Sequence, residues 1–155
     1  MTDIERLLAR HGTYGGHGID HEDRPFHGAL TIEPLPGGRG VSLRFRSVGI
    51  DGEDYRQEWT WVAPDVVRGV AAWQIDQRSR SVRHMRQRSG PSAEGADTTL
   101  MFGIGSPEDV DQHRVQVAFD LWPDGAVTVR HAAGSPGSPL TQRGGVRMVR
   151  TGDLD

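Results

Sequence analysis

Apolar and polar residues alternate along most of the chain beyond its first twelve residues. The alternation is clear in the stretches 41–45, 115–121 and 127–131, where every second residue is apolar or histidine. A period of two predicts strands that bury one face. We expect strands at residues 13–20, 26–34, 41–49, 54–63, 67–76, 81–88, 98–104, 113–122, 126–133 and 143–150. Turn-forming Gly, Pro and Asp residues separate these segments, which is typical of an all-β meander.

The first residues carry a helical pattern instead. Thr2 and Glu5 have the spacing of a capping box, in which each side chain bonds the backbone of the other residue. The apolar residues of this segment share one stripe: Ile4, Leu7 and Leu8. We expect a short helix that ends where Gly12 adopts a left-handed conformation. A helix this short is marginal alone, so its apolar stripe must dock on the sheet.

Two turns predict the register of their hairpins. The segment Pro-Asp-Gly at 123–125 suits a three-residue loop, because its residues favour two right-handed conformations and then a left-handed one. This loop pairs Leu121 with Val127, Phe119 with Val129, and Val117 with His131. All apolar residues of the two strands then lie on one face.

The segment Ile-Asp-Gly at 50–52 is interpreted in the same way. A three-residue loop there pairs Ser47 with Tyr55, Phe45 with Gln57, and Leu43 with Trp59. This register turns Trp59 and Trp61 toward the interior, beside Phe45.

A meander of this many strands exposes two sheet edges unless the sheet closes on itself. We therefore predict an all-β fold, a barrel of about ten antiparallel up-and-down strands with a short N-terminal helix. We expect a single barrel domain over residues 1–150 and a frayed tail at 151–155. A barrel of this size can hold a ligand.

Composition removes several classes of function. The chain of 155 residues has no cysteine and no lysine, which excludes disulfides, thiolate metal sites and Schiff-base chemistry. Its net charge of −3 does not favour nucleic acid or an anionic membrane as partner. The N-terminal residues lack the apolar run of a secretory signal, so we expect a cytoplasmic location.

The stretch 11–28 holds four of the seven histidines. His17 and His21 are four residues apart, a spacing that suits zinc on a helix. Three nearby glycines disfavour a helix, and on a strand both histidines face away from Tyr14. We expect these histidines to face water and predict no metal, with a metal or interface site, or a ligand role, as the alternatives.

Other polar residues qualify for a cavity. His131 faces inward in the predicted hairpin register, and His113 lies on the corresponding face of the partner strand. An inward histidine is either a hydrogen-bonded core residue or a ligand-binding or acid–base group. The segment 77–89 is rich in arginine and has no apolar face. It either lies on an exposed part of the barrel or brings Arg86 and His84 to an anionic ligand.

The start of the first strand and the meander after it resemble a known superfamily. A short helix followed by G-x-Y-x-G, at Gly12, Tyr14 and Gly16, resembles the G-x-W start of the calycins. V-S-L-R-F-R at 41–46, followed by D-G-E-D-Y-R-Q-E-W at 51–59, is similar to bacterial fatty-acid-binding-protein-like barrels, including the nitrobindin-like group. The resemblance covers nearly the whole chain through its layout more than through a sharp motif.

The resemblance implies roles for several residues. In calycins the aromatic ring of the motif packs at the closed end of the barrel, under an arginine from the last strand. Tyr14 would take the place of the ring and Arg147 or Arg150 that of the arginine, a contact worth roughly 0.5–2 kcal/mol. Nitrobindin-like proteins carry haem on a histidine near the chain's end, whereas this sequence has none after His131. Fatty-acid-binding proteins hold a carboxylate with an arginine and a tyrosine, and only the arginines are present near these C-terminal strands.

Three functions remain as hypotheses. The first is a binding module for a small amphipathic or anionic molecule. Its expected ligand-binding residues are His131, His84, Arg86, His113, Trp59, Trp61, Phe45 and Phe119. The second is an enzyme that uses His131 or His113 as general base, and the third is haem binding through an inward histidine. We expect no other cofactor, and a homodimer through an outer sheet face stays open.

Overall fold

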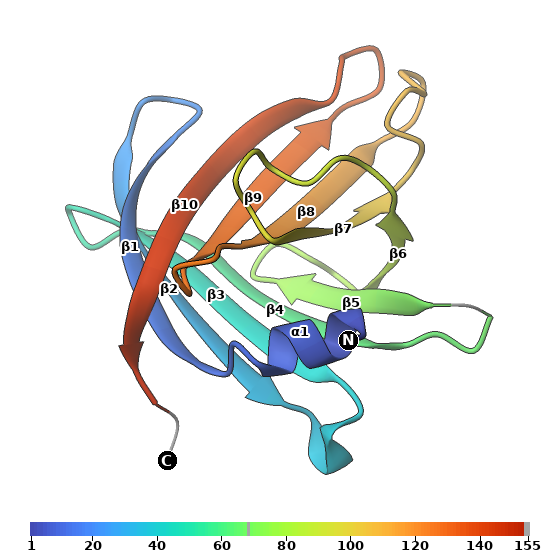
Figure 1. The fold of residues 1–155 in the computed structure, drawn as a ribbon. Helices are drawn as coiled ribbons and strands as arrows, with labels where there is room; N and C mark the ends of the chain where they lie inside the picture. Colours follow the sequence, from blue (N-terminus) through green and yellow to red (C-terminus); the bar gives the residue numbers. More distant parts are fainter. Residues whose placement is uncertain (68, 154–155) are drawn as a thin grey trace.

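Ten antiparallel strands close into one barrel in the order β1-β10-β9-β8-β7-β6-β5-β4-β3-β2 (Figure 1). The computed structural model describes residues 1–67 and 69–153. The elements are α1 (Asp3–Leu8), β1 (Gly12–Asp20), β2 (Pro25–Pro34), the short 3-10 helix η1 (Pro36–Gly38), β3 (Val41–Gly49), β4 (Asp54–Pro64), β5 (Val70–Asp76), β6 (Arg83–Arg88), β7 (Thr98–Ile104), β8 (Arg114–Leu121), β9 (Val127–Gly134) and β10 (Thr141–Gly152). The predicted fold class is confirmed, and each expected strand is present.

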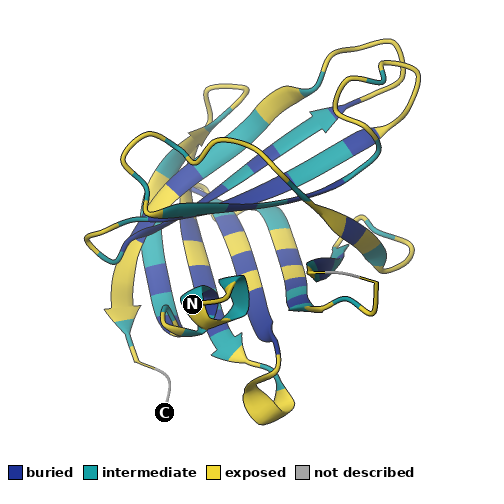
Figure 2. Ribbon diagram, turned by 45° about the vertical axis from the view of Figure 1, so that its right-hand side comes forward, coloured by how far each residue is buried: buried dark blue, intermediate teal, exposed yellow. Residues whose placement is uncertain are grey.

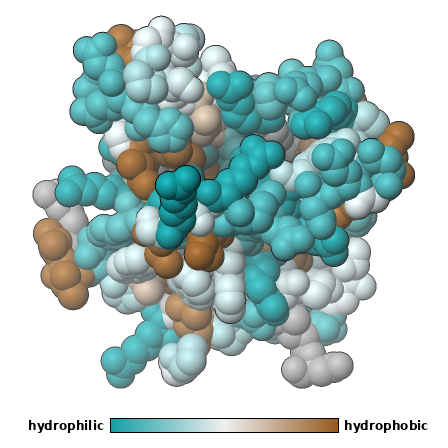
Figure 3. All heavy atoms as spheres, turned by 180° about the vertical axis from the view of Figure 1, so that it is seen from behind, coloured by the Kyte–Doolittle hydropathy of each residue, from teal (hydrophilic) through white to brown (hydrophobic). Residues whose placement is uncertain are grey.

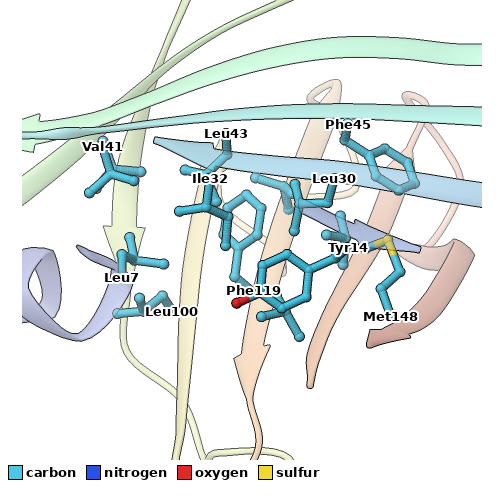
Figure 4. Close-up of a cluster of buried hydrophobic side chains, with 14 of the residues drawn as sticks. Leu7, Tyr14, Leu30, Ile32, Val41, Leu43, Phe45, Leu100, Phe119 and Met148 are labelled. Carbon is cyan, nitrogen blue, oxygen red and sulfur yellow. The ribbon is translucent and has the colours of Figure 1, made fainter. Parts of the chain in front are cut away.

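The short helix α1 caps one end of the barrel. Its capping box is present, since Glu5 N donates to Thr2 Oγ1 and Thr2 N donates to Glu5 Oε2. Leu7 is fully buried and lies beside Val41 and Leu100 (Figure 4). The expectation that a left-handed Gly12 ends the helix is wrong. The last helical residue is Leu8, and the residue that caps it, Ala9, has a right-handed backbone conformation. Gly12, at φ 142°, begins β1.

The barrel interior is the hydrophobic core. Buried and exposed residues alternate along most strands, so the ribbon is striped (Figure 2). One continuous cluster of buried apolar side chains from α1 and the inner strand faces runs through the barrel interior (Figure 4). Buried polar residues also face the interior, among them Glu58 and His131.

The two predicted hairpin registers had different outcomes. In the β8–β9 hairpin, Val117 pairs with His131 as expected, and His131 faces inward. In the β3–β4 hairpin the expected register is wrong. The three-residue loop at 50–52 is present, since Gly49 N donates to Glu53 O at 2.8 Å and Val48 pairs with Asp54. A bulge at Tyr55 then shifts the register, so Phe45 pairs with Glu58 instead of Gln57.

The shift of one residue in β4 exchanges its two faces, because side chains alternate along a strand. Glu58 and Thr60 therefore face the interior and are buried. Trp59 and Trp61 lie on the outer face, so the prediction that they line the barrel is wrong. Trp59 is 41% exposed, and its Nε1 donates to Ser42 Oγ at 2.6 Å.

The strand pair β1–β10 closes the barrel. Tyr14 pairs with Arg150 across it, and the Tyr14 hydroxyl donates to Arg10 O at 2.6 Å. β10 extends to Gly152, which pairs with Thr13 of β1. Residues 151–152 of the tail that was expected to fray therefore belong to this strand. Residues 154–155 of that tail lie outside the described residues. No helix in the described part of the chain is long and apolar enough to cross a membrane.

Candidate functional site

A cavity of about 120 Å³ opens at the end of the barrel opposite α1. Its apolar wall comes from β2, β3, β9 and β10: Phe26, Phe45, Val129 and Val146. Four arginines also line it: Arg24, Arg56, Arg78 and Arg143. In the view from behind, strongly hydrophilic side chains gather over the centre and apolar ones show between them (Figure 3).

A buried carboxylate–imidazole pair lies at this cavity. His131 Nε2 is 3.0 Å from both carboxylate oxygens of Glu58, and Arg56 Nη1 donates to Glu58 Oε2 at 3.0 Å. The Glu58 side chain is 1% exposed. The inward register of β9 supplies the histidine, and the shifted register of β4 supplies the glutamate.

The charge state of Glu58 follows from its neighbours. Burial raises the pKa of the Glu58 carboxyl, but the charges and hydrogen bonds of His131 and Arg56 outweigh it. The net effect lowers the pKa below its ordinary value, so Glu58 is an anion at neutral pH. A buried ion pair is weak evidence for stability by itself. Stability alone therefore does not account for Glu58 and its partners, which makes them a candidate functional site.

Two polar atoms face the cavity without a protein partner. His131 bonds Glu58 through Nε2 alone, and neither His131 Nδ1 nor Ser47 Oγ has a hydrogen bond within the described residues. Neither atom is among the fully buried unpaired atoms of the described chain, so both are accessible from the cavity.

The arginines of the cavity differ in their partners. Arg24 binds Asp20 at 2.8 Å, and Arg56 binds Glu58. By contrast, Arg78 and Arg143 form no ion pair with any carboxylate of residues 1–67 or 69–153. Arg143 occupies the irregular position in β10 between Gln142 and Gly144. Two cationic groups are therefore left to meet an anion at this opening.

A buried arginine holds the two loops beside the cavity. Arg114 is 1% exposed, and its guanidinium donates to carbonyl oxygens of Gln112, Pro107, Ser135 and Ser138. These carbonyls belong to the β7–β8 and β9–β10 loops. The bonds join the two loops to the barrel wall at Arg114 in β8.

A second polar cluster adjoins Glu58 inside the barrel. Asp76 pairs with Glu58 across β4–β5, and Arg83 donates to Asp76 Oδ2 at 2.6 Å and to Gln74 Oε1 at 3.1 Å. Burial raises the pKa of the Asp76 carboxyl, but hydrogen bonds from the Arg78 backbone, Ser79 and Arg83 lower it by more. The net effect is a pKa below the ordinary value. The Asp76 carboxylate of this cluster is paired, whereas Arg83 Nε is buried without a hydrogen-bond partner in the described residues.

The predicted ligand-binding residues are dispersed. Only His131 and Phe45 among them line the cavity. Phe119 is buried in the apolar core. His113 is exposed after the β7–β8 loop. The inward orientation considered for His84 and Arg86 is wrong, because Met85 takes the inner face of β6 and both neighbours are exposed.

The set that the sequence predicts lacks the residues on which this site depends: Glu58, which binds His131, and the cavity-lining residues Ser47, Arg78 and Arg143. The three-residue loop at 50–52 by itself would turn Glu58 outward, but a bulge at Tyr55, between the pairs Val48–Asp54 and Ser47–Arg56, shifts the register by one residue. Glu58 and Thr60 lie on the same strand face as the buried residue Val62, because side chains alternate along a strand. This spacing from Val62 is a signal that could have placed both residues inward. Arg143 lies in a register irregularity, which no local pattern predicts.

The residues assigned to barrel closure lie close to the expected place but make other contacts. Arg150 pairs in register with Tyr14, and its Nη2 donates to His11 O at 2.8 Å. Arg147 lies over the Trp122 ring at 4.6 Å and binds Asp124. In the described chain, no cation–π contact involves Tyr14.

The side chains at the cavity do not fit a metal or haem. No group of three His, Cys, Asp or Glu residues in the described segments is arranged to hold a metal ion. His17 and His27 are exposed neighbours with ring centroids 5.1 Å apart. Glu58 engages His131 Nε2 and leaves Nδ1 open to the cavity, but a cavity of about 120 Å³ is too small for a porphyrin.

Comparison with known proteins supports the fold and goes no further. No protein-family model and no curated protein sequence matches the chain. Among solved structures, the chain is similar to Rv2717c from M. tuberculosis, with a TM-score of 0.64 and 12% sequence identity. The match covers 97% of this chain and 99% of that one. At this identity the likeness concerns the barrel alone.

Proposed function

We propose that the protein binds a small anionic molecule with an apolar body in the cavity at the open end of its barrel. One observation carries the proposal: Arg78 and Arg143 line an apolar-walled cavity without a carboxylate partner in the described chain. Guanidinium groups bind carboxylates and phosphates through charge-assisted hydrogen bonds. An anion would therefore complete the charge balance of this opening.

The size of the cavity limits the ligand. A cavity of about 120 Å³ is smaller than a typical drug-sized pocket of roughly 300–1,000 Å³. It is close to the engineered cavity of about 150 Å³ that binds benzene. The ligand, or the part of it that enters, has the volume of a single six-membered ring.

The resemblance to calycin-like carriers supports the same proposal. Those barrels hold apolar molecules inside, and the fatty-acid-binding group holds a carboxylate with arginine. In this chain the carboxylate-binding arginines would be Arg78 and Arg143 at the opening. The cavity volume favours a shorter ligand than a long-chain fatty acid.

Calorimetric titration with benzoate tests the proposal, with benzamide as the uncharged analogue. We expect benzoate to bind and benzamide to bind at least tenfold more weakly, because a hydrogen bond to a charged group contributes about 1.5–3 kcal/mol. Arg78→Gln with Arg143→Gln should abolish this preference. Arg39→Gln, which removes a single arginine charge at an exposed site outside the cavity, is the control for each of the two substitutions. Equal binding of the two probes, or no binding of benzoate, would overturn the proposal.

A second function is favoured by the orientation of His131. A carboxylate that binds Nε2 and leaves Nδ1 open to a cavity resembles the support of a general base in hydrolases. Hydrolysis of 4-nitrophenyl acetate tests it, with His131→Gln as the variant and His84→Gln as the control on the outer face. Turnover that only His131→Gln removes supports an enzyme; wild-type protein without turnover rejects this alternative.

A further inference from the structure

The unpaired polar atoms of the cavity belong either to buried residues or to arginines nearer the surface. Ser47 and His131 are 6% and 7% exposed, so Ser47 Oγ and His131 Nδ1 lie deep in the barrel. Arg78 is exposed and Arg143 is partly exposed, so their guanidinium groups lie nearer the opening. A ligand that satisfies both needs an anionic group toward the opening and a second polar group further in.

A hydroxyl fits the deep end better than other polar groups. It donates one hydrogen bond and accepts others, so it matches the serine hydroxyl and the imidazole at once. It also matches His131 in either charge state, since Nδ1 accepts when the ring is neutral and donates when it is protonated. A second carboxylate would instead lie near the buried anion Glu58, which repels it.

Apolar side chains line the same cavity as the two sets of polar atoms. Phe26, Phe45, Val129 and Val146 all line the cavity, and the Phe45 ring is 5.6 Å from the His131 ring. An apolar skeleton between the anion and the hydroxyl would fill this volume. A six-membered ring has the appropriate volume for about 120 Å³.

We propose that the ligand is a compact ring hydroxy acid, such as a hydroxybenzoate, bound with its carboxylate at Arg78 and Arg143 and its hydroxyl at Ser47 and His131. This inference rests on the proposed anion-binding function and names the class of molecule that the cavity takes. It assigns recognition of the hydroxyl to two residues on opposite walls, from β3 and β9.

Titrations with 4-hydroxybenzoate, benzoate and terephthalate test the inference. We expect 4-hydroxybenzoate to bind about tenfold more tightly than benzoate, because benzoate leaves Ser47 and His131 unpaired. Terephthalate should bind more weakly than either. Ser47→Ala should weaken 4-hydroxybenzoate severalfold and leave benzoate unchanged. Ser92→Ala, at an exposed site outside the cavity, is the control.

The ring nitrogens of His131 give a readout that needs no variant. In ¹⁵N NMR spectra, 4-hydroxybenzoate should shift the Nδ1 resonance, and benzoate should leave it nearly unchanged. Equal affinity for both acids, lost together in Arg78→Gln with Arg143→Gln, would overturn the hydroxy-acid inference and leave the anion-binding function intact. Failure of all three acids to bind would reject both. Tighter binding of terephthalate than of 4-hydroxybenzoate would overturn the inference, because the deep end would then prefer a second anionic group to a hydroxyl.

Discussion

Replacement of His131 by leucine removes one of the two side chains that hydrogen-bond the Glu58 carboxylate. The remaining partner among the described residues is Arg56, whose side chain is 32% exposed, whereas that of Glu58 is 1% exposed. Breaking a buried pair by removing one partner costs about 3–5 kcal/mol. Because Arg56 stays at 3.0 Å and compensates part of the charge, we expect His131→Leu to destabilise the protein by about 3 kcal/mol.

The double variant Glu58→Leu with His131→Leu should recover most of this loss. It removes the buried charge together with its partner, and an apolar pair of similar volume is often as stable as a buried ion pair. Arg56 would then extend its guanidinium into solvent from its position near the opening. We expect the double variant to lie within about 1 kcal/mol of the wild type.

Urea denaturation at pH 7, followed by tryptophan fluorescence, measures both effects. With a slope of about 2 kcal/mol per molar urea, His131→Leu should lower the midpoint by about 1.5 M. The double variant should unfold within about 0.5 M of the wild type. If the two substitutions proved additive, or if His131→Leu cost under about 1 kcal/mol, the pair would not act as a buried charge couple.

Three further predictions concern acid stability and packing. The folded pKa of Glu58 lies below its unfolded value, so its stabilisation is complete above pH 4.5 and is lost as pH falls through the folded pKa. Glu58→Gln should therefore show a smaller loss of urea midpoint below pH 4.5, and an unchanged slope against pH would contradict this. Leu7→Ala should cost about 2–5 kcal/mol by opening a cavity beneath α1, measured by urea unfolding; a loss below about 1 kcal/mol would show that α1 does not cover the core. Gly16→Ala should lower the melting temperature strongly, because a Cβ there overlaps the carbonyl oxygen of Arg147 in β10. Gly144→Ala, which meets no atom within 4 Å, is its control, and equal melting of the two would refute the close approach.

Much of the fold is predictable from local features. Each expected strand lies within a few residues of its observed bounds, because alternation and turn residues are local signals. The β8–β9 register is predictable as well, since the turn at 123–125 and the apolar faces of both strands agree on one alignment. That alignment is sufficient to predict the inward position of His131, which is confirmed by its burial.

The candidate site is harder to predict because it depends on pairings between distant residues. One bulged residue in β4, Tyr55, turns Glu58 inward and Trp59 outward. Met85 decides the face of β6, which removes His84 and Arg86 from the predicted ligand set. The local pattern at 77–89 is compatible with either face.

By itself, the sequence determined the helix cap, the strands, the closed all-β architecture and the inward position of His131. These features depend on residues that are close along the chain or on the requirement to bury one sheet face. Only the tertiary structure decided that His131 meets Glu58, 73 positions away, and that Arg78 and Arg143 meet at the same cavity. Closure of the barrel brings these residues together from β3–β4, β5–β6, β9 and β10, and no local pattern encodes that arrangement.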